Sequence, residues 1–167
     1  MTLSDITLLT LLVQLEQGGF AATDASSWAQ DALLEGFDSV SLRVLAGLGP
    51  DAQSFEVRPL LRDALRELGI TPPVGEPLLR AYASAVAQEL HDGHITADVA
   101  VERIHETVIS PLHHPDDLMP LCYLWEGNTP DCAGSVDGPE RDALILIETK
   151  RLLLPESPFL RSEPAGA

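Results

Sequence analysis

Residues 4–17 constrain the fold most, because their apolar side chains cover almost the whole circumference of a helix. Ser4 is placed to cap this helix, and Asp5 lies in its first turn, where a negative charge suits the helix dipole. Gly18 and Gly19 then end it. A helix that is apolar nearly all round is usually covered by other helices on several sides. The segment therefore predicts a helix at the centre of a helical bundle.

The rest of the chain also predicts helices, because apolar residues recur at helical spacing between capping residues, glycines and prolines. Residues 144–147 also fit a strand, but the flanking charges and the segment's length favour a helix. The fold class predicted is all-α, a single bundle of seven or eight helices over residues 1–154. We expect a hinge at 69–77 and a flexible tail at 155–167. Further helices are expected at about 23–34, 39–47, 54–68, 77–91 and 96–109, from 116 with a fresh turn at 120–127, and at 140–154.

The expected helix 54–68 has two predicted faces. Phe55 and Val57 are expected inside, together with Leu60, Leu61, Ala64 and Leu65. Arginines recur every four residues, with acidic residues interleaved between them. This second pattern predicts a solvated face with weak surface ion pairs. The three arginines are Arg58, Arg62 and Arg66.

The chain is strongly acidic, with 26 Asp and Glu against 10 Lys and Arg and a net charge of −16. Residues 1–42 hold six acids and no Lys or Arg, and residues 81–140 hold eleven acids and one arginine. This charge argues against nucleic acid and anionic membranes as partners. It favours a basic protein or a cation, although acidic faces also simply keep many proteins soluble. We expect a non-catalytic binding protein that engages a basic protein, with an immunity or inhibitor role as one version.

The candidate partner-binding residues lie mainly in the stretch 96–127, where Thr96 is placed to cap a helix and Pro111 to stop it. Asp116 and Asp117 open a further short helix, where they also suit its dipole. Trp125 could pack in the core or serve a partner. The candidates for partner binding are Asp92, Asp98, Glu102, Glu106, Asp116, Asp117, Trp125 and Glu126.

The alternative function is a metal-binding protein or a metal-dependent enzyme that uses the histidines around 91–114, because imidazole and carboxylate groups are ligands for zinc, nickel and similar ions. The chain has no HExxH motif, so exposed or capping histidines are the competing interpretation. Cys122 lies among apolar residues and is expected to be a buried, inert thiol. No nucleophile motif or phosphate-binding loop is present, so we predict no catalytic residue and no cofactor. The candidate ligands are His91, His94, His105, His113 and His114.

Cellular location is inferred from what the sequence lacks. Cys122 and Cys132 form no CxxC pair, and we expect reduced thiols. The N-terminal region lacks the basic residues of a signal peptide, and no segment reaches the ~20 apolar residues of a spanning helix. These features predict a cytoplasmic protein. They do not indicate its oligomeric state.

The run LHHPDDLMPLCYLWEG, which follows the AVERIH helix, resembles small uncharacterised helical proteins of GC-rich bacteria. The resemblance covers the second half of the chain. It implies a helical fold and no particular activity.

Overall fold

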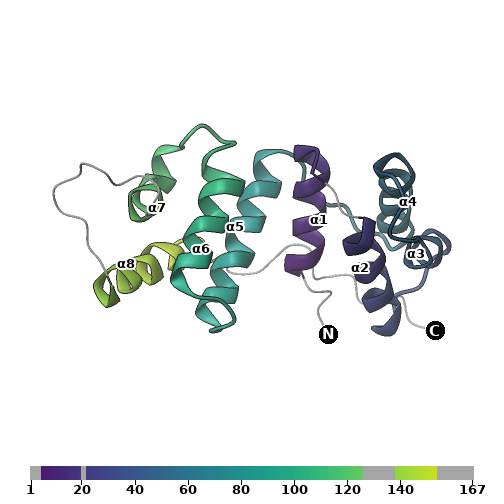
Figure 1. Ribbon diagram of the computed structural model, residues 1–167, viewed down its shortest axis with the longest axis horizontal. Coiled ribbons are helices and arrows are strands. Elements are labelled where there is room, and N and C mark those ends of the chain that lie inside the picture. Colours follow the sequence, from purple (N-terminus) through teal and green to yellow (C-terminus); the bar gives the residue numbers. More distant parts are fainter. Residues whose placement is uncertain (1–4, 20–21, 126–137, 154–167) are drawn as a thin grey trace. The chain divides into compact units, whose positions relative to one another are not determined.

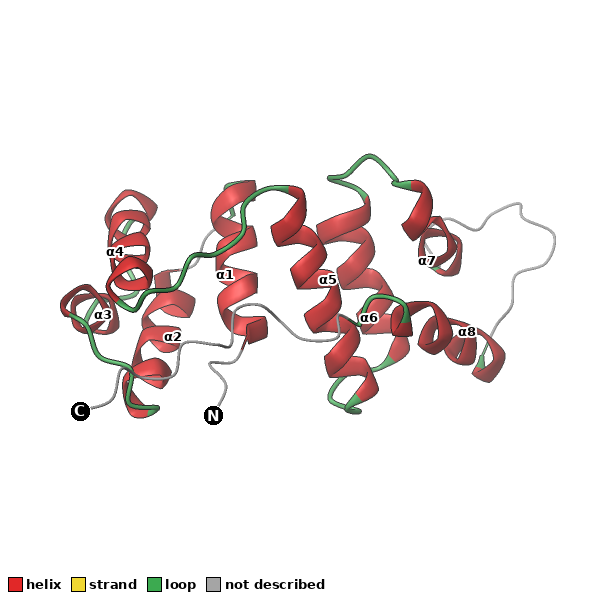
Figure 2. Ribbon diagram, turned by 180° about the vertical axis from the view of Figure 1, so that it is seen from behind, coloured by secondary structure: helices red, strands yellow, loops and turns green. Residues whose placement is uncertain are grey.

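A computed structural model describes residues 5–19, 22–125 and 138–153. Over these ranges the chain forms eight α-helices and no strand, which confirms the all-α prediction (Figure 2). The described residues up to Leu78 form one compact unit, and those from Leu79 onward form a second. The segment expected to be a hinge, 69–77, ends just before this boundary. No helix among the described residues is long and apolar enough to cross a membrane.

The first unit contains four helices (Figure 1): α1 (Asp5–Gln17), α2 (Ala22–Leu34), α3 (Val40–Ala46) and α4 (Ser54–Glu67). Helix α3 contacts both α2 and α4, and α2 also contacts α4. Helix α1 contacts α2. Trp28 of α2 is 2% exposed and is among the largest side chains of the core. Other core side chains come from all four helices and include Leu8, Leu11, Ala25, Leu42, Leu45, Val57, Leu61 and Leu65.

Phe55 is an exception to the predicted core, because its side chain is 73% exposed. The buried residues of α4 are Val57, Leu61, Ala64 and Leu65. At 100° per residue, Phe55 lies roughly on the opposite side of the helix from this stripe. The prediction that it lies inside was therefore wrong, and the helical period explains why.

The short helix α3 is held by side chains of its neighbours. Ser39 caps it by accepting a hydrogen bond from the Leu42 amide at 3.2 Å. Glu67, at the end of α4, accepts from the Ser41 amide at 3.0 Å and from the Ser41 hydroxyl at 2.8 Å. At the other end of α3, Ser26 donates to the Ala46 carbonyl at 3.0 Å. These bonds satisfy helix-end groups that α3 cannot pair internally.

The second unit contains most of α5 (Glu76–His91), then α6 (Ala97–Ile104), the π-helix η1 (His105–Ile109), the 3-10 turn η2 (Asp116–Leu118), α7 (Met119–Leu124) and α8 (Pro139–Lys150). The α7 helix contacts α6, η1 and α8. The run 144–147 is helical, as predicted, with Ile145 buried and Ile147 exposed.

Arg141 of α8 joins three elements of the second unit. Its side chain is buried, and its Nε donates to the Leu124 carbonyl at the end of α7 at 2.8 Å. Its terminal nitrogen donates to the Asp98 carboxylate in the first turn of α6. Because a buried guanidinium must be paired to be tolerated, these contacts fix α8 against α6 and α7.

Replacing Glu67 with glutamine is expected to destabilise the first unit in a pH-dependent way. The bonds from Ser41, followed by that from Ser39, lower the pKa of Glu67 below its usual 4.5. A carboxyl group with a lowered folded-state pKa contributes stability above its unfolded pKa and loses it as the pH falls through the folded value. Urea unfolding should therefore show wild type above Glu67→Gln at pH 7, with the difference shrinking below about pH 4.

Asp31→Asn is the matched control, because it removes one negative charge from an exposed position in the same unit. It should change stability little at either pH. Equal pH dependence for Glu67→Gln and wild type would contradict the role given to Glu67.

Candidate metal centre

His105 is a buried histidine of the second unit and the first residue of the π-helix. Its side chain is 7% exposed, and neither ring nitrogen has a hydrogen-bond partner among the described residues. Leaving a buried polar group unpaired costs roughly 1–3 kcal/mol. An unpaired imidazole inside a native protein therefore suggests a water or an ion as its partner.

The backbone after His105 is wound more loosely than an α-helix. The Ser110 amide donates to the His105 carbonyl at 2.9 Å, which is the i to i−5 bond of a π-turn. Turns of this kind are rare and often lie at functional sites. The π-helix thus begins at His105, directly after α6 ends at Ile104.

His114 is positioned by the way this helix ends. The His114 amide donates to the Ile109 carbonyl at 2.9 Å, and the His113 amide donates to the Ser110 carbonyl at 3.1 Å. These two bonds form a Schellman motif, whose C′ position normally carries glycine. Here His113 and His114 both adopt positive φ angles, 58° and 59°. The chain therefore reverses at two non-glycine residues in the left-handed region, which is an uncommon and strained arrangement.

Cys122, which lies on the six-residue helix α7, completes the cluster. It is buried, and it carries a thiol that is not in a disulfide. One ligand atom each from His105, His114 and Cys122 lies within 4.8 Å of the other two. Tetrahedral bonds of about 2.0–2.3 Å would place such atoms about 3.3–3.8 Å apart. The three side chains therefore need to close by about 1 Å to share one ion.

Trp125 covers His105. The indole and imidazole rings stack with centroids 3.8 Å apart and planes at 14°, and the His114 ring meets His105 edge-on at 5.9 Å. Stacking restricts the plane of the His105 ring, and the indole adds an apolar wall beside it. A wall of this kind limits the access of water and orients a ligand.

The electrostatics favour a neutral His105. Burial lowers the pKa of His105, the nearby His114 lowers it further, and Glu106 acts in the opposite direction. The neutral imidazole is the form that binds a metal ion. Its state in the folded protein therefore suits a ligand.

The other candidate histidines lie outside this cluster. His91 is within 3.3 Å of the Thr149 hydroxyl, which ties the end of α5 to α8. His94 and His113 are exposed. Of the five histidines named from the sequence, the structure brings together His105 and His114.

The acidic candidates that the structure describes are all exposed, and some of them also pair with other side chains. Asp98 accepts from Arg141, and Asp117 accepts from Arg80 at 2.6 Å, a hydrogen bond that lowers the pKa of Asp117. Trp125 lies on the imidazole cluster and is half-buried. Asp92 accepts from the Gln88 side chain at 2.9 Å, Glu102, Glu106 and Asp116 are exposed as well, and Glu126 lies outside the described residues.

Cys122 is the member of the cluster that the sequence did not assign to it. Its apolar neighbours indicated an inert thiol, and burial is indeed what the structure shows. The useful signal was the order His105, His114, Cys122 within a short stretch, since imidazole and thiolate together are typical zinc ligands. Comparisons with protein-family models, with curated proteins and with solved structures gave no match.

His113→Gly is expected to stabilise the second unit by about 0.5–1 kcal/mol. A left-handed backbone costs a non-glycine residue about 1–2 kcal/mol, which glycine avoids. Part of this gain is lost because glycine makes the unfolded chain more flexible. Thermal unfolding of His113→Gly and His113→Ala measures this. Alanine keeps the backbone strain and should give no such gain, so an equal gain from both would contradict the strained geometry at His113.

Proposed function

We propose that this protein binds a zinc-type transition-metal ion through His105, His114 and Cys122. The observation that carries the proposal is the convergence of their ligand atoms to within 4.8 Å of one another. The two unpaired nitrogens of His105 support it, since a metal ion would satisfy one of them. Of the five histidines that the sequence suggested as metal ligands, the proposal keeps two, and it adds a cysteine as the third ligand.

The ligand types favour zinc over the hard cations. Two imidazoles and one thiolate suit a borderline-soft ion, whereas magnesium and calcium prefer carboxylate and carbonyl oxygens. Copper(II) intrinsically binds such a ligand set more tightly than zinc does. Which of the two ions occupies the site in a cell therefore depends on their availability. Three protein ligands leave a fourth position for water, an arrangement found in catalytic zinc sites.

The test is zinc titration of protein purified without an affinity tag, followed by calorimetry. Wild type should bind one equivalent, and zinc should raise the melting temperature because it binds the folded state. Cobalt is a second probe, because a Cys122 thiolate bonded to Co²⁺ should give a charge-transfer absorption in the near ultraviolet.

The variants His114→Ala and Cys122→Ala should each weaken zinc binding by at least about 100-fold, more than the ~10–100-fold cost of changing an outer-sphere group. His114 is exposed, so its removal should leave the fold intact. The matched control is His94→Ala, which removes an exposed histidine of the same unit that lies outside the cluster. Unchanged binding in His114→Ala, or its loss in His94→Ala, would overturn the proposal.

Recognition of a basic protein is a second candidate. It is supported by the exposed carboxylates of residues 81–125, of which Glu102 and Glu106 lie one turn apart. An acidic surface gives fast, salt-sensitive association with a basic partner. The double variant Glu102→Gln/Glu106→Gln should weaken capture of a basic protein such as cytochrome c at low salt. Capture that ignores ionic strength would rule the candidate out.

A further inference from the structure

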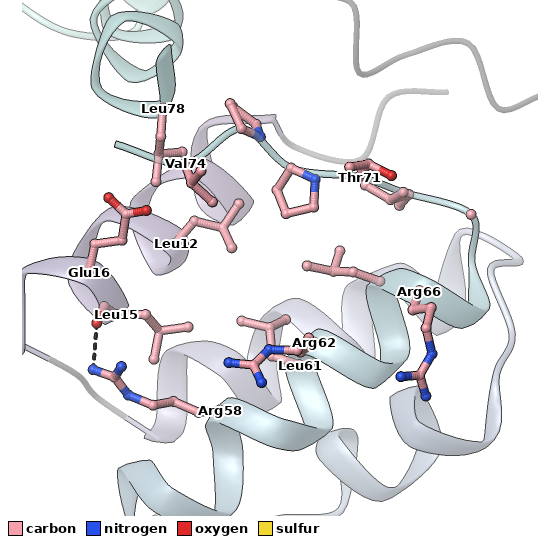
Figure 3. Close-up of a pocket in the computed structure, with 15 residues that line it drawn as sticks. Leu12, Leu15, Glu16, Arg58, Leu61, Arg62, Arg66, Thr71, Val74 and Leu78 are labelled. Atoms are coloured by element: carbon pink, nitrogen blue, oxygen red, sulfur yellow. Dashed lines mark hydrogen bonds between the residues drawn. The ribbon is translucent and has the colours of Figure 1, made fainter. Parts of the chain in front are cut away.

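The first unit contains a pocket of about 500 Å³ that no part of the metal centre uses (Figure 3). Its walls come from α1, from α4 and from the segment 69–78. Most of the surface is apolar and includes Leu12, Leu15, Leu61, Leu65 and Ile70. A volume within roughly 300–1,000 Å³, apolar walls and a few polar groups are typical of small-molecule sites.

The pocket also gathers most of the positive charge of its unit. Residues 1–78 contain four basic residues, all arginines, and three of them, Arg58, Arg62 and Arg66, line the pocket. The same residues hold eleven acids, and among these Glu16 alone is in the lining. In Figure 3 the three guanidinium groups lie along the α4 side. The pocket is therefore locally cationic in a unit that is otherwise acidic.

Arg62 is the member of this row that is available to a ligand. Arg58 donates to the Leu15 carbonyl, and Arg66 pairs with Asp63 at 2.9 Å. Arg62 has no hydrogen bond or ion pair with any described residue, and it occupies the middle of the row. An arginine fork matches a carboxylate, with which it forms two parallel hydrogen bonds.

The opposite wall is held in place by Glu16. Its two carboxylate oxygens accept from the Gly75 amide at 3.0 and 3.2 Å, which joins the segment 69–78 to α1. Gly75 has a φ of 63°, a conformation that favours glycine. Pro72 and Pro73 restrict the same segment. The negative charge in the lining thus has an internal partner, and the same bonds hold the segment 69–78 against α1.

We propose that this pocket binds an aliphatic carboxylate, with the chain against the leucines and the carboxylate on Arg62. The apolar walls select a hydrocarbon chain, because burying it removes apolar surface from water. The arginine row selects an anionic head over a neutral one. This site is separate from the metal centre and does not depend on it.

Calorimetric titration with decanoate, decanol and acetate separates the two contributions. Decanoate should bind with one site per chain. Decanol, which keeps the chain and loses the charge, should bind at least about tenfold more weakly, as should acetate, which keeps the charge and loses the chain. Higher salt should weaken decanoate binding. Absence of decanoate binding, or equal affinity for decanol, would overturn the proposal.

Two substitutions on exposed side chains test the geometry without disturbing the fold. Arg62→Gln should weaken decanoate binding at least about tenfold, while Arg43→Gln, outside the pocket in the same unit, should not. Val74→Glu places a negative charge in the lining and should abolish binding. Its control is Val40→Glu, since Val74 and Val40 are 71% and 72% exposed.

The same loss of affinity in a variant and its control would attribute the effect to net charge and overturn the assignment of the pocket. Retained affinity in both Arg62→Gln and Val74→Glu would do so as well. Circular dichroism spectra and melting temperatures like those of wild type establish that each variant is folded.

Discussion

The geometry of the candidate metal centre in the second unit depends on the π-turn from His105 to Ile109. An α-helix continued without change would keep its i to i−4 bonds, but the Ser110 amide reaches the His105 carbonyl instead. The His114 amide repeats this wider spacing at the Ile109 carbonyl. The helix end therefore turns back with His114 beside His105, and α7 contributes Cys122 to the same place. Local backbone hydrogen bonding thus determines which side chains can meet.

Positive charge is scarce in this chain, and every described arginine except Arg62 pairs with a carboxylate or a backbone carbonyl. In the first unit the arginines of α4 line a pocket, and in the second Arg141 is buried between helices. A buried guanidinium is costly without hydrogen bonds, and Arg141 donates them to the Leu124 carbonyl and the Asp98 carboxylate. Within the described part of the chain, most carboxylates lie on exposed side chains, where water solvates them.

Much of the fold could be predicted from the sequence, because each helix is defined by local signals. Thr96 caps the helix that it was expected to cap, and apolar periodicity identified most of the buried residues of α4. The prediction that Phe55 is buried was wrong, because this residue of the first turn was assigned to the apolar stripe without regard to its angle on the helix. The correct predictions and the wrong one were all made from the residue pattern of a single helix.

The two sites were harder to predict, because each depends on residues distant in sequence or on unusual backbone angles. Neither His113 nor His114 is a glycine, so nothing in the sequence indicated left-handed conformations there. The arginines of α4 have the spacing of a solvated face, and they line a pocket because the segment 69–78 returns over them. Cys122 looked inert because its apolar neighbours indicate burial but not what lies across the interior.

The stacked pair formed by Trp125 and His105 gives the molecule a useful optical property. The chain has two tryptophans, and each unit contains one of them, Trp28 in the core of the first and Trp125 beside the imidazoles of the second. The two indoles therefore experience different surroundings, one apolar and one in contact with a polar aromatic ring. Each half of the protein carries its own fluorophore, and emission from a single-tryptophan variant would report on one half at a time.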